Sequence, residues 1–270
     1  MLEKIQQTGD FLRNNISDLP KIAIVLGSGL GGLTKEIKVS VSFEYKDIPN
    51  FPVSTVVGHG GKLIFGTING VSVMAMQGRF HYYEGYHMQD VTFPIRVMKN
   101  IGIETLILSN ASGGMNPDFN IGDIMIIRDH INMFPTNPLM GKNYDELGPR
   151  FPDMSEVYDK KLIEKAEKIA EKNEIKVQKG VYVGVSGPCF ETPAEYKMFR
   201  IIGGDVVGMS TVPEAIVARH SNMKCFALSV VTDLGVDGQV CNVSHEEVLE
   251  AANKAEPLMT KIIKDLLIEI

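Results

Sequence analysis

Residues 62–76 read "KLIFGTINGVSVMAM", two apolar runs separated by Asn69 and Gly70. An Asn-Gly pair between two such runs is a strong signal for a two-residue β-hairpin turn, because both turn positions take a positive φ. The stretch therefore predicts two antiparallel strands, over residues 62–68 and 71–76. Any sheet that contains them has an antiparallel part.

Other apolar runs punctuated by glycine recur along the chain, and helical patterns alternate with many of them. We expect further strands in the runs KIAIVLGSG, ETLILSN, DIMII, VYVGVSG, DVVGMS and KCFALSVVTD, which begin at residues 21, 104, 123, 181, 205 and 224. Residues 154–173 have apolar positions at helical spacing. No linker, low-complexity tract or repeat divides the sequence. We expect an α/β fold in which residues 1–270 form a single domain, with a mixed, twisted central β-sheet flanked by helices.

Three Ser/Thr-x-x-Glu sequences mark helix starts, at residues 192–195, 211–214 and 244–247. In this pattern the hydroxyl and the carboxylate cap each other's backbone N–H groups. Each one follows a strand or the loop after it. Because ligands of α/β proteins bind at the carboxyl ends of strands, we expect the functional residues there.

The composition excludes several classes of protein. A chain of 270 residues that is 44% hydrophobic and 22% charged should bury a substantial core. The net charge of −6 and the absence of a basic run argue against nucleic acid as a partner. Apolar runs of about six residues are too short to span a membrane, and no secretory signal is visible, so we expect a cytoplasmic protein. Three cysteines without C-x-x-C spacing argue against disulfides and zinc.

The loop "GSGLGG", residues 27–32, formally matches G-x-G-x-x-G. One interpretation is a turn that needs positive φ, and another is a loop whose backbone N–H groups and Ser28 hydroxyl hold an anion. A third, an NAD-dependent oxidoreductase, needs a following helix and a second parallel strand. Residues 33–52 do not give a convincing version of either.

The segment "GRFHYYEGY", residues 78–86, follows the second strand of the hairpin. The guanidinium of Arg79 suits phosphate oxygens, and His81 can donate or move a proton near neutral pH. The plain alternative is a surface hairpin end with solvated charges, but unpaired charge at the end of a buried strand is costly. An extended backbone would send alternate side chains to opposite faces, with Arg79, His81 and Tyr83 on one and Phe80, Tyr82 and Glu84 on the other.

Other strand ends also carry polar or aromatic residues. Taken singly, each has a plain structural explanation, such as a helix N-terminal charge for Glu191, a core position for Met209 and a loop acid for Asp233. Together the strand ends offer anion donors, an aromatic platform, carboxylates and a hydroxyl. These residues are Asn110, Ala111 and Ser112, then Phe190 and Glu191, then Met209 and Ser210, and lastly Asp233.

The order and wording of these motifs resemble the trimeric-type purine nucleoside phosphorylases. The resemblance runs through most of the chain and includes GSGLG, GHGG, GRFHYYEGY, NASGG, RFPDMSEVYD, GPCFETPAE, VGMSTVPEAIVARH and HEEVLEAA. It implies phosphorolysis of purine (deoxy)ribonucleosides, chiefly inosine and guanosine, to free base and (deoxy)ribose 1-phosphate, in purine salvage. It also implies a homotrimer, inorganic phosphate as co-substrate, and no metal or organic cofactor.

The resemblance assigns site residues by position. It gives phosphate binding to Ser28, His59, Arg79, His81, Asn110, Ala111 and Ser210. It gives ribose binding to Tyr83, Met209, His245 and, from a neighbouring subunit, Phe151, and purine binding to Phe190, Glu191 and Asp233. His81, Glu191 and Asp233 are the catalytic candidates. Cleavage of the glycosidic bond builds positive charge on the sugar and negative charge on the purine, and this arrangement stabilises both.

Position 233 departs from the family pattern, because enzymes restricted to 6-oxopurines typically have asparagine where this chain has Asp233. An ionised Asp233 would accept from a 6-amino group, whereas a protonated one, whose pKa is raised by burial, would donate to O6 and N7. We therefore expect 6-oxopurine nucleosides to be favoured by Glu191 and adenosine to be tolerated better than usual. A 5'-methylthioadenosine phosphorylase is the nearest alternative, but His245 suits a 5'-hydroxyl. A nucleoside-binding protein without activity would not need the phosphate residues.

Overall fold

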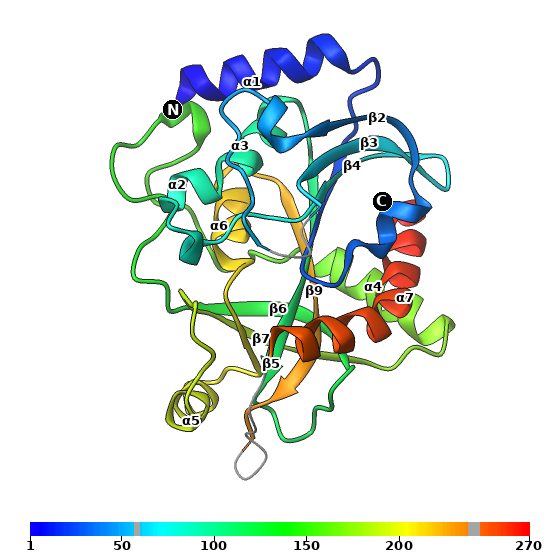
Figure 1. Ribbon diagram of the computed structural model, residues 1–270, viewed down its shortest axis with the longest axis vertical. Coiled ribbons are helices and arrows are strands. Elements are labelled where there is room, and N and C mark those ends of the chain that lie inside the picture. The colour runs from blue at the N-terminus through cyan, green and yellow to red at the C-terminus, as the bar shows by residue number, and fades with distance from the viewer. Residues whose placement is uncertain (57–59, 237–243) are drawn as a thin grey trace.

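The structure is a computed structural model that describes residues 1–56, 60–236 and 244–270. Within these residues, nine strands form one sheet in the order β2-β3-β4-β1-β5-β8-β7-β6-β9. Strand β5 also pairs with β9, so five of the strands close into a ring that the other four extend. Figure 1 shows β2, β3 and β4 in the upper part of the molecule and β5, β6 and β7 below them. The strands are β1 (Ile22–Leu26), β2 (Lys38–Glu44), β3 (Lys62–Ile68), β4 (Val71–Gln77), β5 (Thr105–Gly114), β6 (Ile124–Asn132), β7 (Val177–Gly184), β8 (Val206–Gly208) and β9 (Lys224–Leu234).

Strand directions confirm the predicted mixed sheet. The hairpin of β3 and β4 is antiparallel, and Asn69 and Gly70 turn it with φ values of 51° and 83°. Strand β1 runs parallel to both β4 and β5, and all five of its residues are buried. Burial on both faces is typical of a central parallel strand between layers of helices.

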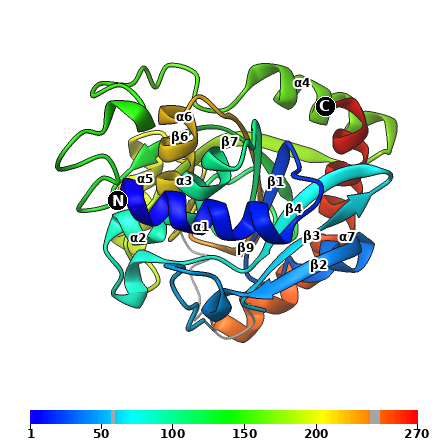
Figure 2. The ribbon, with the colours of Figure 1, turned by 90° about the horizontal axis from the view of Figure 1, so that it is seen from above.

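Helices cover both sides of the sheet. Figure 2 shows α3 and α6 on one side of β1 and β9, and α7 on the other. Helix α1 packs on α3, and α4 packs on α7. No helix among the described residues is long and apolar enough to cross a membrane. The helices are α1 (Leu2–Asn15), α2 (Met88–Val91), α3 (Phe93–Asn100), α4 (Lys160–Lys172), α5 (Pro193–Ile201), α6 (Val212–His220) and α7 (His245–Glu269).

The three predicted capping boxes are confirmed at the starts of α5, α6 and α7. In each, the Ser or Thr hydroxyl accepts from the backbone of the Glu three residues later, and that Glu accepts from the backbone of the Ser or Thr. These boxes fix where three helices begin beside strand ends, and so fix the loops that precede them.

Some elements differ from the sequence-based expectation. Strand β2 and helix α1 were not predicted; β2 lies at the sheet edge with most side chains exposed or half-exposed, so its sequence lacks a buried apolar run. Helix α4 begins later than residue 154, because Asp159 caps it by accepting from the Leu162 N–H at 2.9 Å. Strand β5 continues through Gly114 instead of turning at the glycines, because β9 pairs along its whole length.

Candidate active site

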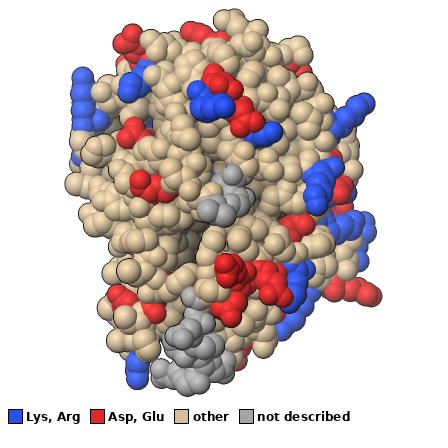
Figure 3. Space-filling view, in the orientation of Figure 1, with Lys and Arg blue, Asp and Glu red and all other residues tan. Residues whose placement is uncertain are grey.

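A cavity of about 490 Å³ lies where the residues that follow β1 and β4 and the late residues of β5, β8 and β9 meet the start of α7. Figure 3 shows a hollow on this side of the molecule, with acidic and basic side chains scattered around it. Of the candidate residues, Phe151 lies outside the cavity, and His59 lies outside the described residues. The lining includes the candidates Ser28, Arg79, His81, Tyr83, Asn110, Ala111, Phe190, Glu191, Met209, Ser210, Asp233 and His245.

The glycine loop after β1 is a tight turn pressed against β5. Gly29 has φ of 71°, and a Cβ on Gly27 would lie 2.7 Å from the Ser109 carbonyl oxygen. The interpretation as a positive-φ turn is therefore confirmed, and the turn places Ser28 in the cavity. A short 3₁₀ helix (Gly31–Glu36) and the antiparallel edge strand β2 follow, so the βαβ context of a dinucleotide site is lacking and that alternative is wrong.

Arg79 is a buried cation, 1% exposed, held by a bidentate ion pair with Glu214. Its Nε donates to Glu214 Oε1 at 3.1 Å, and its Nη2 lies 3.1 Å from Oε2. Its Nη1 donates to the Ser109 carbonyl oxygen at 2.6 Å. Because Glu214 also caps α6, the helix and β5 together fix the guanidinium at the cavity wall.

His81 and Glu84 form a second pair beside Arg79. Residues 82–84 form a 3₁₀ turn, so the extended backbone predicted there ends at His81, and the expectation that Glu84 faces away from His81 was wrong. One Glu84 oxygen accepts from the His81 backbone at 2.7 Å and lies 3.1 Å from its Nδ1. The other accepts from the Thr55 N–H and hydroxyl at 2.8 and 2.7 Å.

Burial and hydrogen bonding set the charges of this pair. Burial lowers the pKa of His81, although the Glu84 hydrogen bond opposes the shift. Burial alone would raise the pKa of Glu84, but the hydrogen bonds from His81 and Thr55 lower it to about 2. Near neutral pH, Glu84 is therefore ionised and the imidazole is neutral. Its Nδ1–H then points at Glu84, and Nε2 carries the lone pair.

A strained turn holds Ser210. Thr211 has φ of 65°, which is rare for a β-branched residue, and the Val212 N–H donates to the Ser210 carbonyl oxygen at 2.7 Å, as in a γ-turn. The Thr211 hydroxyl accepts from Asn110 Nδ2 at 2.8 Å, and Asn110 Oδ1 accepts from Ser229 at 2.5 Å. These contacts tie β5, β9 and α6 together at the cavity floor.

Two carboxyls stand at the opposite end of the cavity from His81. Asp233, 7% exposed, accepts from the Tyr196 hydroxyl at 3.0 Å through Oδ2 and from the Thr232 hydroxyl at 3.0 Å through Oδ1. Burial raises the pKa of Asp233, and these two hydrogen bonds oppose the shift. Burial also raises the pKa of Glu191, assisted by the nearby charge of Asp233 and opposed by a hydrogen bond from Tyr196.

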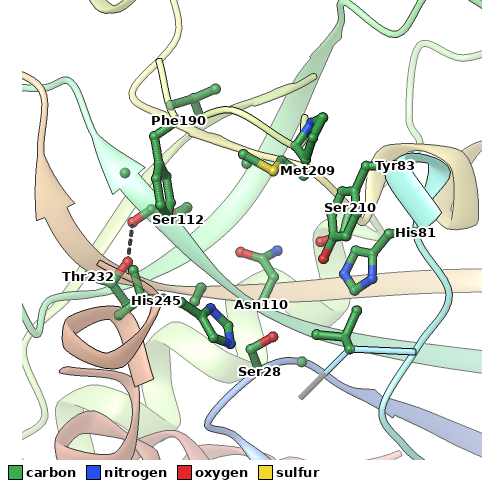
Figure 4. A pocket seen from close by; sticks show the side chains of 18 of the residues that line it. Ser28, His81, Tyr83, Asn110, Ser112, Phe190, Met209, Ser210, Thr232 and His245 are labelled. Atoms are coloured by element: carbon green, nitrogen blue, oxygen red, sulfur yellow. Dashed lines mark hydrogen bonds between the residues drawn. The ribbon is translucent and has the colours of Figure 1, made fainter. Parts of the chain in front are cut away.

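The remaining candidates lie along the space between these ends. Figure 4 shows Phe190 and Thr232 at one end, His81 and Tyr83 at the other, and Met209, Ser28 and His245 between them. Tyr83 stacks on His81, with ring centroids 4.7 Å apart. Burial raises the pKa of Tyr83 to about 12, so its hydroxyl keeps its proton near neutral pH.

Sequence reasoning missed several residues of the site. Glu214 was noted only as part of a capping box, and Thr232 and Tyr196 carried no signal as site residues. Within GRFHYYEGY, Tyr82 does not line the cavity, and its ring packs against Phe134. Within the described residues, no group of three or more His, Cys, Asp or Glu side chains could hold a metal ion.

Comparisons with known proteins agree with this geometry. A family model described as the phosphorylase superfamily matches residues 21–268. Purine nucleoside phosphorylase 1 of Bacillus subtilis is 52% identical over 264 residues, 98% of this chain and 97% of that protein. Purine nucleoside phosphorylase of Rattus norvegicus is 46% identical over 98% of this chain and 94% of its own.

Solved structures also resemble this chain. A crystal structure of a Schistosoma purine nucleoside phosphorylase in complex with hypoxanthine superposes with a TM-score of 0.93 at 42% identity, covering 98% of this chain and 96% of that one. Another, from Schistosoma mansoni, contains adenosine and has the same TM-score and identity. The chain therefore belongs to the phosphorylase superfamily and, within it, to the purine nucleoside phosphorylases.

Proposed function

We propose that the protein cleaves purine nucleosides with inorganic phosphate, giving the free base and (deoxy)ribose 1-phosphate. The observation that carries this is the layout of one cavity, with a buried Arg and His pair at one end and an aromatic ring with two carboxyls at the other. Membership of the purine nucleoside phosphorylases supports the same reaction. The role in purine salvage follows from this activity.

At the first end, Arg79, His81, Ser28, Ser210 and the Ala111 amide bind phosphate. The Arg79 guanidinium supplies positive charge, and the neutral His81 Nε2 accepts from the hydroxyl of a monoprotonated phosphate. Phosphate held below the sugar acts as nucleophile and stabilises the oxocarbenium character that develops as the glycosidic bond breaks. Asn110 mainly holds the floor in place, because both ends of its amide are bonded to Thr211 and Ser229. His59 remains a predicted phosphate residue.

At the other end, Phe190 packs on the purine and Glu191 accepts its N1–H. Asp233 meets N7 and the 6-substituent, where negative charge collects on the leaving base. Tyr83, Met209 and His245 contact the ribose between the two ends.

Inosine and guanosine are the proposed principal substrates, because an ionised Glu191 accepts the N1–H that only 6-oxopurines carry. Burial raises the pKa of Asp233, which favours the protonated form that donates to O6, whereas the ionised form accepts from a 6-amino group; the carboxyl at this position is why we propose adenosine as a further substrate. Replacing Asp233 with Asn should change the ratio of kcat/KM for adenosine to that for inosine, and an unchanged ratio would remove this part of the proposal. Activity on 5'-methylthioadenosine is the alternative, but His245 in the cavity disfavours an apolar 5'-group.

We further propose a homotrimer without a metal or organic cofactor, located in the cytoplasm. Phe151 supports the trimer, because its side chain is 88% exposed and lies outside its own subunit's cavity. A ring this exposed is free to contact a second chain. In the trimer, Phe151 reaches the ribose of a neighbouring site.

One experiment tests the reaction. The protein is incubated with inosine, guanosine, adenosine or 5'-methylthioadenosine, with and without phosphate, and the released base is identified. We expect hypoxanthine and guanine to appear fastest, and only with phosphate. Release that ignores phosphate, or no release from any nucleoside, would contradict the proposal.

A further inference from the structure

Tyr196 of α5 is a buried side chain that the scheme above leaves without a role. It is 3% exposed, and its hydroxyl donates to Asp233 Oδ2 at 3.0 Å. A buried tyrosine hydroxyl normally finds a hydrogen-bond partner, and here the partner is the carboxyl that meets the purine 6-position. Tyr196 itself does not line the cavity.

The backbone around this contact makes room for it. A Cβ on Gly113 of β5 would lie 2.9 Å from Asp233 Oδ2 and 3.0 Å from the Tyr196 hydroxyl oxygen. A Cβ on Gly235, after β9, would lie 2.2 Å from the Tyr196 ring. Side chains at either position would therefore displace the pair.

Tyr196 and Thr232 both donate to Asp233, and the Tyr196 hydroxyl also interacts with the carboxyl of Glu191. The Thr232 hydroxyl has one proton, and it lies within hydrogen-bond distance of both Asp233 Oδ1, at 3.0 Å, and the Ser112 carbonyl oxygen, at 3.2 Å. A hydrogen bond donated to a carboxylate favours its ionised form, so Tyr196 opposes the effect of burial on Asp233.

The other groups that face Asp233 are few. Glu191 approaches from the loop before α5, and its charge interacts with Asp233. Strand β5 contributes the uncharged Ser112 and Gly113, and His245 lines the same cavity from α7. The titratable groups around Asp233 are therefore Tyr196, Glu191 and His245.

The two classes of purine need opposite hydrogen bonding at this end. A 6-oxopurine presents an N1–H donor and an O6 acceptor, whereas a 6-aminopurine presents an N1 acceptor and an amino donor. An ionised Asp233 accepts from the amino group, and a protonated Glu191 donates to N1. A protonated Asp233 instead donates to O6, with Glu191 ionised.

We propose that Tyr196 is a positioning residue that holds Asp233 as a hydrogen-bond acceptor and thereby extends the site from 6-oxopurine to 6-aminopurine nucleosides. The inference rests on the proposed phosphorolysis. Tyr196 acts through Asp233, so removing its hydroxyl should affect the choice of base more than turnover in general.

The test measures kcat/KM for adenosine and inosine from pH 5 to 9 in the wild type, Tyr196→Phe, Asp233→Asn and the double variant. Tyr196→Phe should lower the ratio of kcat/KM for adenosine to that for inosine by about fivefold to tenfold, as expected for loss of one hydrogen bond, and should raise the pH at which the ratio changes. In the Asp233→Asn background, Tyr196→Phe should change the ratio much less than in the wild type, because no carboxyl remains at position 233 to ionise and only the contact of Tyr196 with Glu191 is lost.

Tyr158→Phe is the matched control. It removes another buried tyrosine hydroxyl, which lies 3.1 Å from His130 Nδ1 and outside the cavity, and should leave the ratio unchanged. If Tyr196→Phe does not fold, Gly113→Ala disturbs the same contact from β5 and should shift the ratio in the same direction.

An equal fall for both substrates without a change in the pH profile would overturn the inference, as would the same shift of the ratio in the Asp233→Asn background. A wild type that cleaves inosine but not adenosine would overturn it and leave the phosphorolysis standing. No phosphate-dependent release from either nucleoside would overturn both.

Discussion

The buried ion pair of Arg79 and Glu214 gives the sharpest prediction about stability. Glu214 is 4% exposed and accepts from Arg79 Nε at 3.1 Å and from the Thr211 N–H at 3.0 Å. Glu214→Gln keeps the volume of the side chain but removes its charge, and leaves Arg79 buried without its counter-ion. Removing one partner of a buried pair costs about 3–5 kcal/mol of unfolding free energy. Because the amide oxygen can still accept one hydrogen bond, we expect the lower end, about 3 kcal/mol.

Phosphate should reduce the loss of unfolding free energy that Glu214→Gln causes. An anion bound beside Arg79 replaces the missing charge, so saturating phosphate should restore more unfolding free energy in Glu214→Gln than it adds to the wild type. The assay is urea unfolding at one protein concentration, with and without phosphate. Glu195→Gln is the control, because Glu195 fills the same capping position on α5 but is exposed and pairs with no buried cation. A loss below about 1 kcal/mol, or equal stabilisation by phosphate in both proteins, would refute the reasoning.

Three further predictions follow from the site. The pKa of Glu84 is lowered to about 2, so its ionised form stabilises the fold above its usual pKa of 4.5, and this stability is lost as the pH falls toward 2. Glu84→Gln should therefore make the free energy of unfolding depend less on pH between 4.5 and 2. A dependence identical to that of the wild type would contradict this. Phe151→Ala should raise KM for inosine roughly tenfold, the value of one buried aromatic contact, with little change in subunit stability because the ring is 88% exposed; an unchanged KM would argue against a shared site. Gly27→Ala should raise KM for phosphate about tenfold, because the new Cβ would lie 2.7 Å from the Ser109 carbonyl oxygen and displace Ser28. The control is Gly70→Ala, whose Cβ meets nothing within 4 Å and which should leave KM for phosphate unchanged.

Local sequence patterns predicted most of the fold. The Asn69-Gly70 turn, the glycine-punctuated apolar runs and the capping boxes each report on a few neighbouring residues, and all of these were read correctly. Strand β2 was missed because an exposed edge strand lacks a buried apolar run. The closure of β5 on β9 also has no local signal, because it depends on the order in which distant strands pair.

The candidate site, like the fold, could be predicted only in part. Residues that follow an apolar run, such as Ser28, His81 and Met209, were identified from the sequence and line one cavity. The residues that support them were not identified, because Glu214 is 135 residues from its partner Arg79 and Tyr196 is 37 residues from its partner Asp233. Pairing between side chains on separate elements depends on tertiary packing, which a motif does not encode.

The strained turn at Thr211 ties ligand affinity to the completion of folding. A β-branched residue keeps a φ of 65° only while its surroundings over-determine it, and here those surroundings come from three elements, through Asn110 on β5, Ser229 on β9 and Glu214 on α6. Until all three have docked, Thr211 relaxes and Ser210 has no fixed place beside Arg79. The proposed phosphate site is therefore complete only in the fully folded subunit, and we expect a nascent or partly unfolded chain not to bind phosphate.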